Sequence, residues 1–158
     1  NYNELSNFEY NVRLLDGQQI NVNTSLMPSS LFQKCGIREL HDPVAVDYDF
    51  FLRAALLYNI KFHLIQKSLI QYRIHIEQLS HKNILKTLKF TSKIKDEIIQ
   101  NLDEPSQNKF IKQLEIYQNS KSIKQKIIKF GMKFLSSIPS LVSDRILIFY
   151  LNKIRQSR

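Results

Sequence analysis

The sequence predicts a mixed α/β fold in the first half of the chain and an all-α extension in the second, with helix dominant overall. Three observations carry this prediction. The pair Asp16-Gly17 lies between two apolar-containing runs, which is typical of a hairpin turn because both residues tolerate positive φ. Two later apolar runs have the length of short strands. After residue 81 the apolar residues recur at helical spacing, with few helix-breaking residues.

We therefore divide the chain into residues 1–81 and an extension over residues 82–158. In the first region, a short helix is expected over Ser29–Cys35, stopped by Gly36. A second helix, Asp47–Tyr58, is apolar almost all round, so we expect it to be buried. The two strand-like runs that follow span residues 62–65 and 69–72.

In the extension, helices are expected on both sides of a turn at Asp103-Glu104-Pro105. They carry apolar residues at helical spacing between Ile84 and Ile99, and again between Phe110 and Tyr117. A third helix begins near Ser122 and ends at Pro139, and a last one is expected over residues 142–154.

Composition limits the classes of protein to which the chain can belong. Cys35 is the single cysteine, so no internal disulfide can form and a reducing compartment is expected. No run approaches the roughly 20 apolar residues that cross a bilayer, so no membrane span is expected. The sequence begins at Asn1 without a leader of the charged-then-apolar type, so we expect residues upstream of it to be missing.

The net charge of +9 is concentrated at the C-terminal end. Residues 121–158 contain 9 Lys or Arg against 1 Asp or Glu. A helix here places Ile123, Ile127, Phe130 and Phe134 on one face and Lys126, Lys129 and Lys133 on another. This pattern is typical of a helix on an anionic membrane surface, and we expect a peripheral position on the inner membrane face. Packing on the rest of the protein is the alternative, and no nucleic-acid-binding module is recognisable.

The residues that carry chemistry lie between residues 21 and 80. Asp47 and Asp49 begin the buried helix, where free N–H groups stabilise carboxylates, and Arg53 follows Asp49 at i+4. A loop rich in polar side chains comes after the second strand-like run. Its candidate residues are Arg73, His75, Gln78 and Ser80.

Together these motifs resemble the C-terminal part of the family 2 glycosyltransferases, which have the GT-A fold. The resemblance covers residues 21–80 and rests on an ordered set with similar spacing. Its members are Ser29-Ser30, Cys35-Gly36, Asp47-Tyr48-Asp49, Leu52-Arg53, and Tyr72-Arg73-Ile74-His75 with Gln78 and Ser80. By this resemblance, residues 1–81 are the C-terminal portion of a GT-A domain.

The resemblance implies transfer of a sugar from a nucleotide-diphosphate sugar to an acceptor hydroxyl, with inversion, in the synthesis of a surface glycan or on a lipid-linked acceptor. It assigns the general base to Asp47, although Val46 stands where the family has glutamate. Asp49 shares or takes over that role in the alternative assignment. Arg73, His75, Gln78 and Ser80, with Asp49, are implied in binding the donor. A Mg²⁺ or Mn²⁺ ion is implied too, held mostly by the absent N-terminal half, with His75 as a candidate ligand.

Each assignment has a structural alternative. The alternative for Asp47 is a helix cap with no catalytic role. We interpret Asp49 first as the partner of Arg53. Asp47-Tyr48-Asp49 can also be read as a metal motif, but its position close before the Tyr-Arg-x-His sequence favours a base. His63 is expected to be packed in the core, and Cys35 to be a small buried residue rather than a nucleophile. For the whole chain, the alternative is a non-catalytic helical adaptor that binds a membrane surface or an acidic partner.

Overall fold

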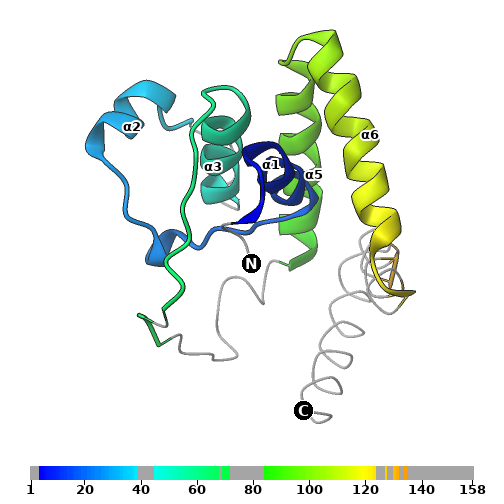
Figure 1. Ribbon diagram of the computed structural model, residues 1–158, viewed down its shortest axis with the longest axis horizontal. Coiled ribbons are helices and arrows are strands. Elements are labelled where there is room, and N and C mark those ends of the chain that lie inside the picture. Colours follow the sequence, from blue (N-terminus) through cyan, green and yellow to red (C-terminus); the bar gives the residue numbers. More distant parts are fainter. Residues whose placement is uncertain are drawn as a thin grey trace.

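The computed structural model describes residues 4–38, 45–67, 69–71 and 84–123, together with residues 127, 130, 131 and 134. Figure 1 shows the arrangement of its helices. They are α1 (Asn7–Asp16), the short 3₁₀ helix η2 (Val22–Thr24), α2 (Ser29–Cys35), α3 (Val46–Leu56), α5 (Ile84–Gln100) and α6 (Glu104–Ser120). Residues 123, 127, 130, 131 and 134 are helical as well.

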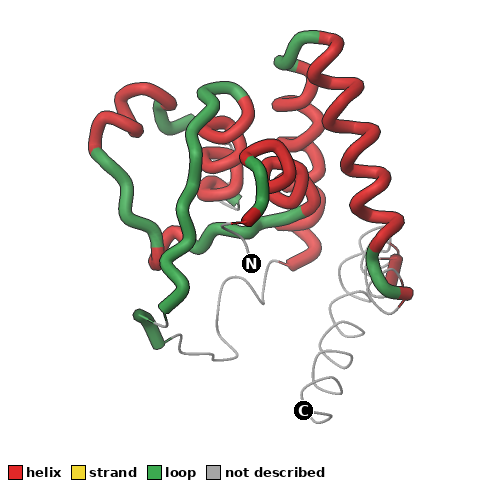
Figure 2. The backbone as a smooth tube through the Cα atoms, viewed as in Figure 1, coloured by secondary structure: helices red, strands yellow, loops and turns green. Residues whose placement is uncertain are grey.

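The prediction of a mixed α/β first half is wrong, because the described residues contain helices and no strand (Figure 2). Nothing described here forms the sheet of a GT-A domain, whereas the prediction that helix dominates is confirmed. The predicted hairpin is replaced by α1. The side chain of Ser6 accepts from the backbone N–H of Glu9, and the Glu9 carboxylate accepts from the N–H of Ser6 at 2.9 Å, which forms a capping box. Gly17 therefore ends a helix instead of turning between strands.

The two strand-like runs have no regular secondary structure over residues 61–66 and 69–71. Their apolar side chains are largely exposed, with Ile65 at 59% and Leu69 at 69%. A strand is stable only when a neighbouring strand pairs with it, and within the described ranges no strand does so. In the first run only Phe62 packs against the core. His63 is exposed too, so the expectation of a packed core histidine is wrong.

The two helices predicted on either side of Asp103-Glu104-Pro105 are confirmed as α5 and α6, and they share one core with the first half. The predicted end of the third helix at Pro139 and the last helix over residues 142–154 lie outside the described residues. Helix α1 packs against α3 and α6, and α3 packs against α5 and α2. In Figure 1, a short turn joins α5 to α6, and Asp103 in that turn caps α6. The largest buried cluster draws on α1, α3, α5 and α6, with Leu15, Leu52, Ile98 and Leu114 among its members. The helical extension therefore covers the apolar faces of α1 and α3.

Two polar contacts hold α1 in this arrangement. The buried hydroxyl of Tyr48 donates to the carbonyl oxygens of Leu14 at 3.1 Å and Leu15 at 3.3 Å. Burial raises the pKa of Tyr48, so the phenol stays protonated and able to donate. Lys121, just after α6, pairs with Asp16 at the end of α1. Helix α3 and the residue that follows α6 are therefore both bonded to the C-terminal end of α1.

Candidate functional site

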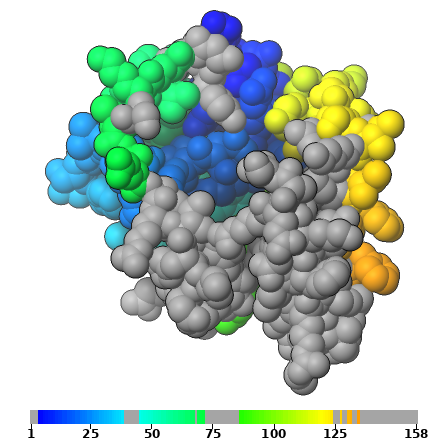
Figure 3. All heavy atoms as spheres, turned by 90° about the horizontal axis from the view of Figure 1, so that it is seen from below, coloured from blue at the N-terminus to red at the C-terminus, as the bar shows by residue number. Residues whose placement is uncertain are grey.

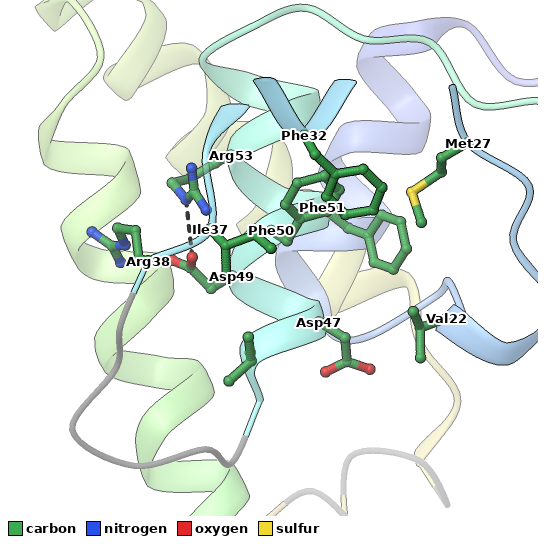
Figure 4. A pocket seen from close by; sticks show the side chains of 11 residues that line it. Val22, Met27, Phe32, Ile37, Arg38, Asp47, Asp49, Phe50, Phe51 and Arg53 are labelled. Atoms are coloured by element: carbon green, nitrogen blue, oxygen red, sulfur yellow. Dashed lines mark hydrogen bonds and ion pairs between the residues drawn. The ribbon is translucent and has the colours of Figure 1, made fainter. Parts of the chain in front are cut away.

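The candidate site lies at the start of α3, where the sequence places two carboxylates two residues apart. Positions i and i+2 of a helix point to different sides, so Asp47 and Asp49 have separate surroundings. Figure 4 shows the Asp49 side chain directed toward Arg38 and Arg53, and the Asp47 side chain on the other side of the helix. These two environments decide what each carboxylate can do.

Asp49 is an enclosed structural carboxylate. Only 1% of its surface is exposed, and Oδ2 accepts from Nε of Arg53 at 2.9 Å while Oδ1 accepts from Arg38 at 2.6 Å. The predicted i, i+4 pair of Asp49 and Arg53 is thus confirmed. Both carboxylate oxygens are held by guanidinium groups, which leaves Asp49 poorly placed to accept a proton from a substrate.

Arg53 extends this network to the end of α2. Its guanidinium donates to the carbonyl oxygens of Cys35 and Gly36, the latter at 3.1 Å. Gly36 has φ of +64°, a left-handed conformation that favours glycine, and it turns the chain so that these carbonyls face Arg53. Arg38 also pairs with Glu97 of α5. One buried carboxylate therefore joins α2, α3 and α5.

Asp47 has a more open environment in the first turn of α3. It is partly exposed, and its Oδ2 accepts from Nε2 of Gln18 at 3.1 Å. Its Oδ1 accepts from the N–H of Tyr48 at 2.9 Å, in the region where the helix dipole favours a negative charge. The helix cap itself is Ala45, which makes no side-chain cap bond, so Asp47 does not act as the N-cap residue. Within the described part of the chain, no cation forms an ion pair with Asp47.

An apolar cavity of about 260 Å³ lies beside these carboxylates. Its walls come from η2, α2, α3 and the segments next to them (Figure 4). Two of the lining rings, Phe32 and Phe50, stack on each other with centroids 5.0 Å apart. The lining residues are Val22, Met27, Phe32, Ile37, Arg38, Val46, Asp47, Asp49, Phe50, Phe51 and Arg53. Small-molecule sites commonly span about 300–1,000 Å³, so this space suits one small group rather than a whole nucleotide-sugar.

Cys35 belongs to a second cluster of buried apolar residues. It is 4% exposed and packs with Leu31, Phe51 and Ala54, as the sequence predicted for a small buried residue. Burial raises the pKa of its thiol, which keeps it protonated and a weak nucleophile.

The structure does not support reading Asp47-Tyr48-Asp49 as a metal site. Both oxygens of Asp49 are occupied by arginines, and the two carboxylates point away from each other. Among the residues that the structure describes, no group of three or more His, Cys, Asp or Glu side chains could hold a metal ion. His75, the candidate ligand, lies outside the described residues.

Several other predicted site residues also lie outside the described ranges. They are Arg73, Gln78 and Ser80 of the polar loop, and Lys126, Lys129 and Lys133 of the C-terminal segment. Sequence reasoning missed Gln18 and Arg38, which contact Asp47 and Asp49. No local motif marks either residue, because each meets its carboxylate across a gap in sequence that only folding closes.

Four apolar residues described in the C-terminal segment are strongly exposed. Ile123 is 76% exposed, Ile127 61%, Phe130 73% and Phe134 59%. No helix within the described part of the chain is both long and apolar enough to cross a membrane.

Comparison with protein-family models, with curated proteins and with solved structures finds no match to this chain.

Proposed function

We propose that this chain is part of a glycosyltransferase that moves a sugar from a nucleotide-diphosphate sugar to an acceptor hydroxyl, with Asp47 as the general base. The observation that carries the proposal is the difference between the two carboxylates of α3. Asp47 is partly exposed at an apolar cavity, whereas Asp49 is buried between two arginines. Of the two, only Asp47 has the access that a general base requires.

The proposal also draws on the ordered set of motifs in residues 21–80, which resembles the family 2 glycosyltransferases. It does not depend on a sheet within this chain. The motifs that carry the resemblance include the carboxylates of α3 and the Leu52-Arg53 pair on the same helix. Arg53 has a structural reason to occupy its position, since it neutralises Asp49 and holds the turn at Gly36.

In the proposed reaction, the acceptor hydroxyl gives its proton to the Asp47 carboxylate as the hydroxyl oxygen attacks the anomeric carbon of the donor. The new carbon–oxygen bond forms as the bond to the diphosphate breaks, and the nucleoside diphosphate leaves. A base must lie within hydrogen-bond reach of the proton that it takes. Gln18 donates to Oδ2 of Asp47, so it would orient the carboxylate. The apolar side chains of the cavity would exclude water around it.

The test is turnover of nucleotide-sugars by the protein as the cell makes it, with Mg²⁺ or Mn²⁺ present, beside an Asp47→Asn variant. Loss of a general base typically lowers the rate by about 10²–10⁴-fold, and we expect a loss in that range. Asp103→Asn, which removes a carboxylate that caps α6, is the matched control and should keep the parent rate. Retention of more than about a third of the rate by Asp47→Asn contradicts the assignment of the base.

The second candidate is a non-catalytic helical adaptor that binds a membrane surface or an acidic partner. The exposed apolar side chains from Ile123 to Phe134 favour it. The two candidates separate on one further measurement. A glycosyltransferase binds a nucleoside diphosphate, and the nucleotide-sugar competes for the same site. Absence of both turnover and nucleotide binding favours the adaptor.

A further inference from the structure

The C-terminal segment carries an apolar helix face that the rest of the described chain does not cover. Ile123, Ile127, Phe130 and Phe134 follow one another at intervals of four, three and four residues, which places them on one side of a helix. All four are at least 59% exposed. In α5 and α6, by contrast, Ile98 at 1% and Leu114 at 8% are buried in the core. The exposed apolar residues described in these helices, Leu88, Ile111 and Ile116, are no more than 50% exposed.

This face is a continuous feature rather than a scatter of single apolar residues. Isolated exposed apolar side chains are ordinary on protein surfaces, whereas a contiguous exposed patch marks an interaction site. The described residues of this segment lie at the surface next to the end of α6 (Figure 3, orange beside yellow). A helix face of this kind needs an apolar environment, so an occupant is expected.

The charge of the same segment narrows the class of occupant. Residues 121–158 contain 9 Lys or Arg and a single acidic residue, Asp144. In a second copy of the chain, the same segment would bring a net charge of +8 against another +8, which disfavours self-association through this face. A nucleic acid would satisfy the charge, but it offers bases for stacking and no continuous apolar surface for Ile123 and Ile127. An anionic bilayer surface provides both acyl chains and negative headgroups.

We propose that the helix face of Ile123, Ile127, Phe130 and Phe134 lies on an anionic lipid bilayer, with its apolar side chains at the boundary between headgroups and acyl chains. The helix rests in the plane of the interface and does not cross it. This inference is independent of the glycosyl-transfer reaction, because it rests on the exposure and charge of a segment distant in sequence from α3.

The absence of tryptophan from the sequence makes a direct test possible. A Phe134→Trp variant places a unique fluorophore on the face, and a Leu26→Trp variant places one at a residue that is 99% exposed elsewhere. Each protein is titrated with vesicles of phosphatidylcholine alone and of phosphatidylcholine with phosphatidylglycerol. We expect the Phe134→Trp emission to move to shorter wavelength only with anionic vesicles, and the Leu26→Trp emission to stay unchanged.

Charge is tested separately by neutralising Lys126, Lys129 and Lys133 together to glutamine. Each basic residue near an anionic surface contributes about 1 kcal/mol, so the triple variant should bind anionic vesicles about a hundredfold more weakly. The matched control neutralises Lys89, Lys93 and Lys112, which are exposed on α5 and α6, and should bind as the parent does. Circular dichroism of every variant confirms that the helices remain.

Four results would overturn the proposal. The first is an unchanged Phe134→Trp emission with anionic vesicles. The second is an equal shift with neutral vesicles, because charge would then have no part in binding. The third is a shift that appears without vesicles as protein concentration rises, which would assign the face to a second copy. The fourth is a shift with single-stranded RNA and none with vesicles, which would assign the segment to nucleic acid.

Discussion

Removal of the Asp49 carboxylate should destabilise the protein far more than removal of the Asp47 carboxylate. Asp49→Asn leaves Arg53 buried without its counter-charge, since the Arg53 side chain is 7% exposed. Breaking a buried pair by removing one partner typically costs about 3–5 kcal/mol. The Arg38 side chain is 33% exposed and can regain water, so its lost contact adds at most about 1 kcal/mol.

This cost is large beside the whole stability of a domain, which is about 5–15 kcal/mol. The assay is urea unfolding followed by circular dichroism at the helical band. With a urea dependence of about 2 kcal/mol per molar, the midpoint for Asp49→Asn should fall by roughly 2 M. Asp47→Asn is the matched control, and its midpoint should move by less than about 0.5 M, because a partly exposed hydrogen bond contributes about 1 kcal/mol or less.

A double variant separates the charge from the packing. Asp49→Leu with Arg53→Met replaces the pair by apolar side chains, which commonly restores stability to a buried ion-pair site. Here the recovery should be partial, because the carbonyls of Cys35 and Gly36 lose the guanidinium that binds them. The reasoning is refuted if Asp49→Asn lies within about 1 kcal/mol of the parent. It is refuted as well if Asp47→Asn is destabilised to the same extent.

Three further predictions concern other elements of the fold. Tyr48→Phe removes a buried hydroxyl from two α1 carbonyls and should cost about 1–3 kcal/mol in urea unfolding; a loss below about 0.3 kcal/mol would show that the bond is not needed. Ala45 has φ of +69°, a left-handed conformation that costs alanine more than glycine. Ala45→Gly should therefore raise the free energy of unfolding in urea by up to about 1 kcal/mol. A lower urea midpoint would contradict the left-handed conformation at this cap. The hydrogen bonds from Ser106 lower the pKa of Asp103 below its ordinary value of 3.8. Since the pKa of Asp103 is lower in the folded protein than in the unfolded one, its ionised carboxylate stabilises the fold. This stabilisation is complete above about pH 5 and is lost as the pH falls through the folded pKa. Thermal unfolding measured across that pH range should therefore depend less on pH in Asp103→Asn than in the parent.

The wrong predictions of a hairpin at Asp16-Gly17 and of a strand over residues 62–65 have a common physical origin. An Asp-Gly pair can close a hairpin or end a helix, and the outcome depends on what precedes it. Here the capping box of Ser6 and Glu9 starts a helix that reaches Asp16, and Phe8, Val12 and Leu15 fall on its buried face. The apolar run over residues 62–65 likewise suits a strand only if another strand pairs with it. A local pattern does not report whether that partner is present.

Predictions from the sequence were confirmed where a structural feature depends only on residues close together in the chain. The all-round apolar character of α3, the Gly36 stop of α2, and the turn at Asp103 before α6 are confirmed because each depends on neighbours in sequence. The pairing of Asp49 with Arg53 is a further case, since the i, i+4 spacing on a helix brings the two side chains together.

By itself, the sequence determined that helix dominates, where α2, α3, α5 and α6 lie, and that two carboxylates stand at the start of a buried helix. The i, i+4 spacing also paired Asp49 with Arg53, but only the tertiary structure supplied the other contacts that separate the two carboxylates. Arg38 reaches Asp49 from the segment after α2, and Gln18 reaches Asp47 from the segment after α1. These contacts join residues 11 and 29 positions apart, so they depend on how the helices pack and leave no signal in the local sequence.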